Sequence, residues 1–195
     1  MRPSLDADPP PDHELVSRAQ AGDADAFSRL FDRHYLRLAR FVRQFGLEPS
    51  DVEDVLSETF LRAFGKISAF DLESGTRYVS YLYAIARNLV TDRLRRRGRM
   101  PEMADIEAAD REPDLRYPGP EECALLRDDI SRIRTAMEAL PSSDREIISL
   151  SYDRELSCRE IQKIMGKPSV SAVTTHLSKA MKRLRQLLAQ TESTR

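Results

Sequence analysis

The sequence predicts an all-α protein of two small helical domains joined by an acidic flexible linker. Over long segments, apolar residues recur at steps of three and four, the spacing of one face of an amphipathic helix. The chain of 195 residues has only seven glycines, and its β-branched residues show little alternation, so strands are not favoured. The segment 100–122 breaks the helical pattern, because it is rich in proline and acidic residues.

The first domain is expected over residues 12–99, after a disordered tail over 1–11. A short helix over 12–21 precedes a long one that ends at Gly46 and has its apolar face at Phe27, Leu30, Phe31, His34, Leu38, Phe41, Val42 and Phe45. Pro49 and Ser50 open the third helix, in which Ser50 and Glu53 are predicted to form a capping box. Its apolar face comprises Val52, Val55, Leu56, Thr59, Phe60, Ala63, Phe64 and Ile67. A fourth helix is expected from Tyr78 to Arg97.

The second domain is expected over residues 123–189, with a tail over 190–195. Its first helix has an apolar stripe at Leu126, Ile130, Ile133, Met137 and Leu140, and Pro141 ends it. Ser143 with Glu146, and Ser157 with Glu160, are predicted to cap the next two helices. A turn over 166–169 then leads into a last helix over 170–188.

Charge is distributed unevenly along the chain, although the formal net charge is only −1. Residues 77–100 hold seven arginines and one acid, a net +6, and residues 157–188 hold seven bases and one acid, again +6. Between them, residues 101–122 hold eight acids and two arginines, a net −6. A single basic run is usually a solvated helix face, but two such patches on two domains indicate two contacts with a polyanion.

Several classes of protein are disfavoured by what the sequence lacks. Cys123 and Cys158 are too few for a disulfide framework. The acidic, proline-rich start is unlike a signal peptide, and no apolar run is long enough to span a membrane. No metal-ligand cluster, phosphate-binding loop or nucleophile motif is present. We therefore expect a cytoplasmic protein that is not an enzyme and that uses no cofactor or metal.

The segments 157–165 and 170–188 fit a helix-turn-helix, the second helix of which enters the major groove in DNA-binding proteins. Ile161, Ile164, Met165, Val173, Leu177, Ala180, Met181 and Leu184 are predicted to face inward. The candidate DNA-binding residues are Ser171, Thr174, Thr175, His176, Ser178, Lys179, Lys182 and Arg183. Short polar groups at the start of this helix suit base edges, whereas Lys182 and Arg183 suit phosphates.

Both halves of the chain resemble the sigma-70 family of RNA polymerase sigma factors, in its compact extracytoplasmic-function group. In the second half, the resemblance rests on Leu140-Pro141, Asp144-Arg145-Glu146, Ser157 to Ile161 and Val173 to Leu184. In the first half, it rests on residues 51–64 and 81–96. The sequence departs from the family where Tyr81 replaces a usual Trp, where Ser57 replaces a usual Gln, and in an arginine-poor recognition helix.

The resemblance implies a factor that binds core RNA polymerase, at its clamp helices and flap, and promoter DNA. It also implies an anti-sigma partner and no membrane association. The residues implied for core binding are Asp51, Glu53, Asp54, Ser57 and Glu58; an acidic helix start favoured by the helix dipole is the simpler reading of the first three. Those for the −10 element are Tyr78, Tyr81, Arg87, Asn88, Arg93, Arg96 and Arg97. Tyrosines can stack on unpaired bases, yet core packing is the alternative and is expected for at least one of Tyr78, Tyr81 and Tyr83.

Two other functions are weighed against this one. A helix-turn-helix regulator that acts without core polymerase would account for the second domain but not for residues 51–64. A nucleic-acid enzyme would need an acidic metal cluster, and the sequence shows none in a plausible constellation.

Overall fold

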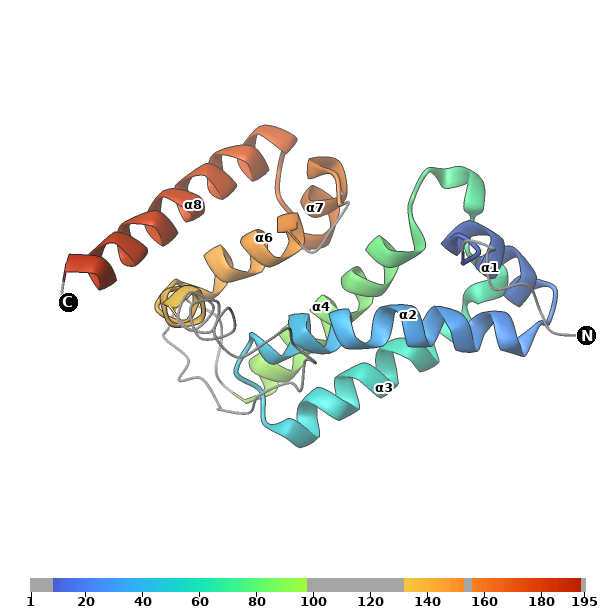
Figure 1. Cartoon of the computed structure of the whole chain (residues 1–195). Coiled ribbons are helices and arrows are strands. Elements are labelled where there is room, and N and C mark those ends of the chain that lie inside the picture. Colours follow the sequence, from blue (N-terminus) through green and yellow to red (C-terminus); the bar gives the residue numbers. More distant parts are fainter. Residues whose placement is uncertain (1–8, 98–131, 153–155, 194–195) are drawn as a thin grey trace, which may run out of the picture.

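The computed structural model describes residues 9–97, 132–152 and 156–193, and every regular element in these ranges is helical (Figure 1). The elements are α1 (Asp12–Gln20), α2 (Ala24–Arg43), α3 (Pro49–Gly65), the 3₁₀ turns η1 (Ile67–Ala69) and η2 (Leu72–Ser74), α4 (Tyr78–Arg96), α6 (Ser142–Tyr152), α7 (Cys158–Met165) and α8 (Val170–Ser193). Residues 132–138 are also helical. The all-α prediction is confirmed for these ranges, whereas the expected linker over 100–122, Leu126 and Ile130 lie outside them.

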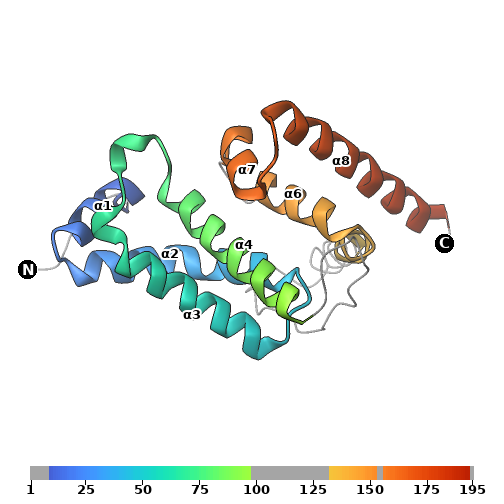
Figure 2. The ribbon, with the colours of Figure 1, turned by 180° about the vertical axis from the view of Figure 1, so that it is seen from behind.

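Helices α1 to α4 form the first domain, in which α2 contacts α1, α3 and α4 (Figures 1 and 2). The predicted apolar faces meet in one core, where Leu30, Leu38, Leu56 and Tyr83 are fully buried. The side chain of Asp23 caps α2 by accepting a hydrogen bond from the Ala26 amide at 3.1 Å. An N-cap of this kind satisfies an amide that the helix itself leaves without an acceptor.

Two of the three predicted capping boxes are wrong. Helix α3 begins at Pro49 and is preceded by Glu48, so Ser50 already lies inside it. Helix α6 begins at Ser142, which places Ser143 inside that helix too. In both cases proline stands just before or at the first turn and sets the helix start earlier than the serine. The third box, between Ser157 and Glu160 at the start of α7, is confirmed.

Helices α6, α7 and α8 form the second domain, and the helix-turn-helix prediction is confirmed. Gly166 has a φ of 63° at the end of α7, a left-handed conformation that glycine adopts at little cost. Ile161 of α7 and Val173 and Ala180 of α8 are buried, as their spacing predicts. Helix α8 continues to Ser193, five residues beyond the predicted end. Ile133, predicted to belong to an apolar stripe, is half-exposed.

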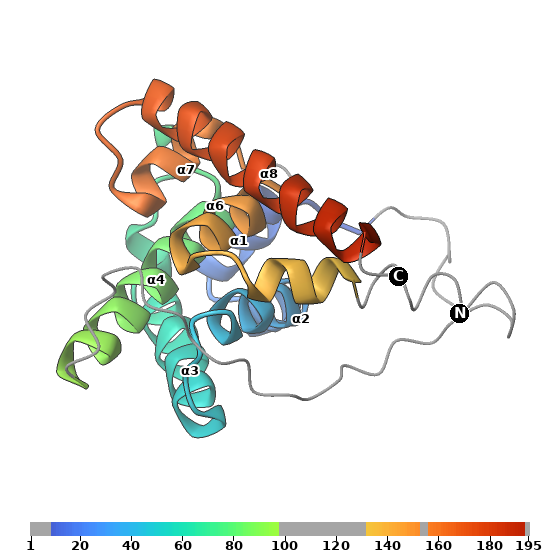
Figure 3. The same cartoon turned by 90° about the vertical axis from the view of Figure 1, so that its left-hand side faces the viewer.

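The two domains pack against each other through α4 and α7. Figure 3 shows the same arrangement from the side, with α7 and α8 above α2 and α3. Helix α4 therefore contacts α2 and α3 of its own domain and α7 of the other. Because α4 carries most of the candidate −10 residues, this packing decides which of them reach solvent.

Candidate functional site

The acidic start of α3 presents an exposed face. Glu53, Asp54 and Ser57 are exposed, and they lie within little more than one turn of the helix. Glu58 accepts a hydrogen bond from Arg62 at 2.7 Å, an i,i+4 pair on the surface. Such a pair is weak in solvent, so both side chains can exchange it for another partner. The face fits a basic surface on a second protein.

Asp51 lies differently from the other acids of α3. Its carboxylate is mostly buried and accepts a hydrogen bond from Arg93 of α4 at 2.5 Å, and it also forms an ion pair with Arg97. Arg93 also pairs with the exposed Asp54 at 3.2 Å. Asp51 is thus not part of the exposed acidic face, because it faces α4. Arg93 and Arg97, both predicted to contact the −10 element, are thus engaged with acids of α3.

An apolar extension of the exposed face was not predicted. Leu61 is 66% exposed and Phe64 is 55% exposed, and they follow Ser57 by four and seven residues, on the same side of α3. Phe64 was expected in the core. It projects beyond the core instead, where its ring meets Phe27 edge-on at 4.8 Å between centroids. Phe27 lies near the start of α2, so little of α2 remains to cover the last turn of α3.

The three tyrosines of α4 divide between core and surface. Tyr78 is only 2% exposed and Tyr83 is fully buried, with its ring edge-on to Phe41 at 4.9 Å. In this conformation the ring of Tyr78 is enclosed by the core and is not accessible for stacking on a base. Burial raises the pKa of Tyr78 well above its usual value. Tyr81 is half-buried, and Asn88 and Arg96 are exposed on the same helix.

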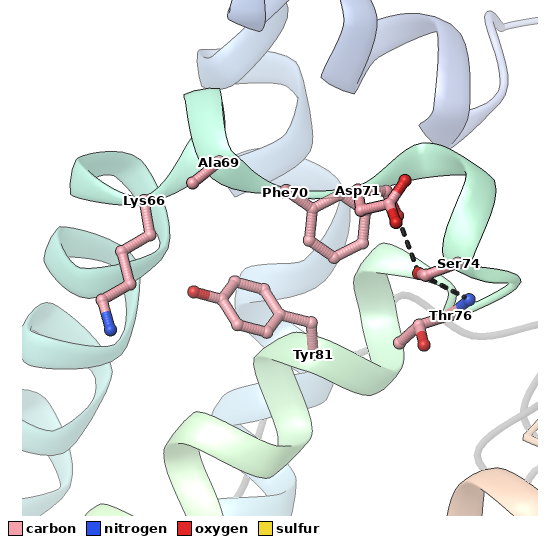
Figure 4. Close-up of a pocket in the computed structure, with 7 residues that line it drawn as sticks. All are labelled: Lys66, Ala69, Phe70, Asp71, Ser74, Thr76 and Tyr81. Atoms are coloured by element: carbon pink, nitrogen blue, oxygen red, sulfur yellow. Dashed lines mark hydrogen bonds between the residues drawn. The ribbon is translucent and has the colours of Figure 1, made fainter.

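Tyr81 forms one wall of an open pocket of about 330 Å³ between the end of α3, the loop that follows it and α4 (Figure 4). The ring of Phe70 packs beside that of Tyr81, with 5.3 Å between the ring centroids and a tilt of 49°. The other lining residues are Lys66, Ala69, Asp71, Ser74 and Thr76. Burial raises the pKa of Tyr81, so its phenol remains a hydrogen-bond donor at neutral pH. Two aromatic walls with polar groups at the rim suit a flat, polar ring.

The loop that carries this pocket is held in place from α1. The side-chain amide of Gln20 donates to the carbonyl oxygens of Ile67 at 3.0 Å and Phe70 at 2.7 Å. Asp71 accepts from the Glu73 amide at 2.8 Å, and Gly75 then turns the chain with a φ of 67°. Sequence reasoning treated this segment only as a connection. Its signal was Phe70, which is the one aromatic residue between Phe64 and Tyr78.

Polar contacts join the two domains at the α4–α7 packing. The Arg77 guanidinium donates to both carboxylate oxygens of Glu160 at 2.9 Å each, and Ser80 donates to Glu160 at 2.5 Å. Burial disfavours the charge of Glu160, but the hydrogen bonds from Arg77, Ser157 and Ser80 outweigh it and lower the pKa from 4.5 to about 2. Glu160 thus caps α7 and anchors it to α4.

A second ion pair crosses between the domains at α6. Arg87 donates to Glu146 at 2.5 Å. Burial raises the pKa of Glu146, and the Arg87 charge opposes that rise without cancelling it. Gln44 adds a neutral contact, because its side-chain oxygen accepts from the Ser149 hydroxyl at 2.9 Å. Arg87, predicted to contact the −10 element, is therefore engaged with the second domain in this conformation.

Most of the predicted recognition face of α8 is solvent-exposed. The exposed members are Ser171, Thr174, Thr175, Ser178, Lys179, Lys182 and Arg183. His176 is the exception and does not belong to that face. It is half-buried, and its Nε2 lies 2.8 Å from a carboxylate oxygen of Asp144 in α6. The periodicity of α8 could not show this, because the partner lies in another helix.

Two further findings limit the chemistry of the chain. Among the residues that the structure describes, no group of three or more histidines, cysteines and acids is placed to hold a metal ion. Within the same ranges, none of the helices combines the length and hydropathy of a membrane span.

Comparisons with known families account for both domains. The family "Sigma-70 region 2" matches residues 30–100, and the family "Sigma-70, region 4" matches residues 130–184. The first range contains the acidic face of α3, the pocket and α4. The second contains the helix-turn-helix. A regulator that acts without core polymerase is not favoured, because it would need only the second.

Individual relatives agree with this assignment. The chain is 34% identical to the ECF RNA polymerase sigma factor BldN of Streptomyces coelicolor, over 96% of this chain and 69% of that protein. It is 33% identical to the RNA polymerase sigma factor NccH of Alcaligenes xylosoxydans xylosoxydans, over 95% of this chain and 98% of that protein. Among solved structures, CnrH in complex with the cytosolic domain of CnrY is similar, with a TM-score of 0.63 and 26% identity, over 92% of this chain and 97% of that one.

These matches cover both domains and most of the chain, in the order that the fold shows. The chain belongs to the extracytoplasmic-function group of the sigma-70 family, whose members bind core RNA polymerase and direct it to promoters.

Proposed function

We propose that this sigma factor divides promoter-directed initiation among three surfaces. The exposed face of α3, formed by Glu53, Asp54, Ser57, Leu61 and Phe64, binds core polymerase. The pocket beside Tyr81 and the outer side of α4 bind the −10 element. The outer side of α8 binds the −35 element. The single observation that carries the proposal is that an aromatic pocket lies beside a basic helix, in the domain that also carries the acidic face.

At the −10 element, the pocket receives a base that has left the duplex. Tyr81 and Phe70 offer aromatic faces, and stacking on such a face stabilises an unpaired base by about 1–3 kcal/mol. Asn88 lies two helical turns after Tyr81, so both project on the same side of α4. An exposed amide can form paired hydrogen bonds with a base edge. Arg96, exposed farther along, is suited to the phosphates of the same strand.

At the −35 element, α8 enters the major groove with its first turns. Thr174, Thr175, Ser178 and Lys179 are short or flexible groups near the start of the helix and are assigned to base edges. Lys182 and Arg183 follow one turn later and are assigned to phosphates. His176 is not assigned to DNA, since it is engaged with Asp144.

The same chain is proposed to act in the cytoplasm, not to catalyse a reaction by itself, and to be held inactive by an anti-sigma factor. Two similar structures support the last point. CnrH was solved with the cytosolic domain of CnrY, and an RpoE from Bartonella quintana, similar in fold, was solved with the anti-sigma factor NepR.

The test of the function is to mix the full chain with purified core polymerase and a DNA library with randomised promoter sequences. We expect a stable complex and transcripts that begin downstream of a shared two-part motif. Binding to DNA without any effect on core polymerase would contradict the proposal and favour a free-standing regulator.

The test of the pocket uses the promoter that emerges from that selection. Tyr81→Ala and Asn88→Ala should reduce promoter opening, measured by permanganate reactivity of unpaired thymines, more than they reduce duplex binding. Tyr81→Phe retains the aromatic face and should retain opening, which separates stacking from a loss of fold. Normal opening with both alanine variants would remove these residues from the −10 surface.

A further inference from the structure

Asp144 of α6 is a buried acid that joins two residues of the recognition helix. Its carboxylate is 2% exposed, and it accepts a hydrogen bond from the Arg183 guanidinium at 2.6 Å. Its other oxygen lies 2.8 Å from Nε2 of His176. Both partners belong to α8, and they are seven residues apart, which places them on the same side of that helix. A buried carboxylate is stable only with such partners.

The geometry of Arg183 is suited to two partners at once. Long side chains in a helix point back toward its N-terminus, so Arg183 reaches back to the acid that His176 also contacts. One terminal nitrogen, Nη1, is engaged with Asp144, while the side chain remains 49% exposed. Within the described residues, its other donors have no acceptor. A planar guanidinium can bond a carboxylate on one side and a phosphate on another, which a lysine ammonium does less well.

We propose that Asp144 is a positioning residue for −35 binding: it holds the Arg183 guanidinium so that its free donors meet a DNA phosphate. His176 completes the arrangement by occupying the second carboxylate oxygen, which fixes the acid itself. Asp144 lies in the first turn of α6, where the helix dipole also favours its negative charge. This inference rests on the proposed placement of α8 in the major groove.

The experiment measures the salt dependence of promoter binding by the complex of the full chain with core polymerase. The probe is the tightest promoter duplex that the unchanged complex selects from a library randomised over the −35 element. Each phosphate contact contributes about 0.9 to the slope of log affinity against log salt. Arg183→Ala should flatten the slope by about one and weaken binding about tenfold. Asp144→Asn should have nearly the same effect, and the double variant should be no worse than Arg183→Ala alone.

Lys182→Ala is the matched control, because Lys182 is the adjacent exposed base of α8. Its effect on the slope should add to that of Asp144→Asn. Two results would overturn the inference but leave the placement of α8 in the major groove intact. One is an unchanged slope with Asp144→Asn, and the other is that the effects of Asp144→Asn and Arg183→Ala add in the double variant. No change of slope with either Lys182→Ala or Arg183→Ala would overturn the groove placement itself.

Arg183→Lys gives an independent reading if Asp144→Asn fails to fold, as judged by circular dichroism. It keeps the charge but replaces the planar group by a single ammonium. We expect the slope to flatten as with Arg183→Ala. A slope equal to that of the unchanged protein would show that charge alone suffices, which contradicts positioning by Asp144.

Discussion

Arg93 donates to Asp51 at 2.5 Å and thereby links the basic end of α4 to the acidic start of α3. The free factor thus neutralises an arginine that is a predicted contact of the −10 element. We predict that Asp51→Asn raises the affinity of the free chain for a duplex of random sequence about three- to tenfold at low salt. Fluorescence anisotropy measures the affinity of each variant for this duplex. Asp92→Asn changes the net charge equally but removes only an exposed pair with Arg95, so an equal rise in both variants would contradict a specific effect of Asp51.

Charge reversal on the exposed face of α3 should weaken binding to core polymerase. Asp54→Lys replaces attraction by repulsion at a complementary surface, and we expect about tenfold weaker binding, mainly through slower association. Asp32→Lys is the control, since Asp32 is an exposed acid on the outer side of α2. Surface plasmon resonance with immobilised core polymerase compares the two. Equal losses would show that only the net charge matters.

The apolar end of the same face gives a sharper test. Leu61→Ala should leave the free energy of unfolding within about 0.5 kcal/mol, because the side chain is exposed, yet it should weaken core binding by about 1–2 kcal/mol. Leu36→Ala removes an equally exposed leucine, 65% accessible, from the outer side of α2. Leu36→Ala should leave both the free energy of unfolding and the binding to core polymerase unchanged. Loss of core binding in both variants, or in neither, would refute the assignment of Leu61.

Tyr78 should prove structural, although its neighbour Tyr81 is proposed to bind the −10 element. Within the described residues, the buried Tyr78 hydroxyl has no hydrogen-bond partner. Removing an unsatisfied buried hydroxyl is neutral or stabilising, so Tyr78→Phe should leave the free energy of unfolding unchanged or raise it by about 1 kcal/mol. Urea unfolding measures this. Promoter opening should stay normal, and a defect there would return Tyr78 to the DNA-binding surface.

Acid should weaken the packing of α7 on α4. Burial disfavours the charge of Glu160, but hydrogen bonds from Arg77 and Ser80, together with those from Ser157 at the start of α7, lower the pKa from 4.5 to about 2. The part of this fall that comes from Arg77 and Ser80 depends on the packing, so the packed form is favoured by the ionised carboxylate. Its contribution is complete above pH 4.5 and is lost as the pH falls from there toward 2. Energy transfer between dyes on the two domains should report separation in this window. In Glu160→Gln, the packing should be weaker at neutral pH, and the separation should not change over the same window.

Local patterns predicted most of the helices, but not the neighbours that each one meets. The recurrence of apolar residues at every third or fourth position located the buried residues of α2 and α8, because burial follows helical periodicity. Phe64 fits the same periodicity and is exposed, since the pattern does not show where the neighbouring helix ends. The capping box between Ser157 and Glu160 could be predicted from the four residues 157–160 alone. The contact between Glu160 and Arg77 was not, because it joins residues 83 positions apart.

The same limit applied to the candidate site. Tyr78 and Tyr81 lie three residues apart on one side of α4, and Phe70 of the preceding loop contacts both rings. Tyr78 also meets the buried His34 of α2, a neighbour that the periodicity of α4 does not show. Asp144 looked like part of a helix start, and its link to His176 and Arg183 depends on how α6 packs on α8. Charge counting found both basic segments correctly, but it could not show that Arg87 and Arg93 are already paired with acids.

The contact between α4 and α7 also sets how far the free factor can reach along DNA. The −10 and −35 elements lie about 25 base pairs apart, which is about 85 Å of duplex at 3.4 Å per base pair. Two small domains held together by contacts between α4 and α7 cannot place α4 and α8 on sites separated by that distance. A packed factor therefore meets at most half of a promoter at a time, and a whole promoter comes within its span only after the domains have parted. Promoter choice that depends on both elements is therefore expected of the assembled polymerase and not of the packed, unassembled protein.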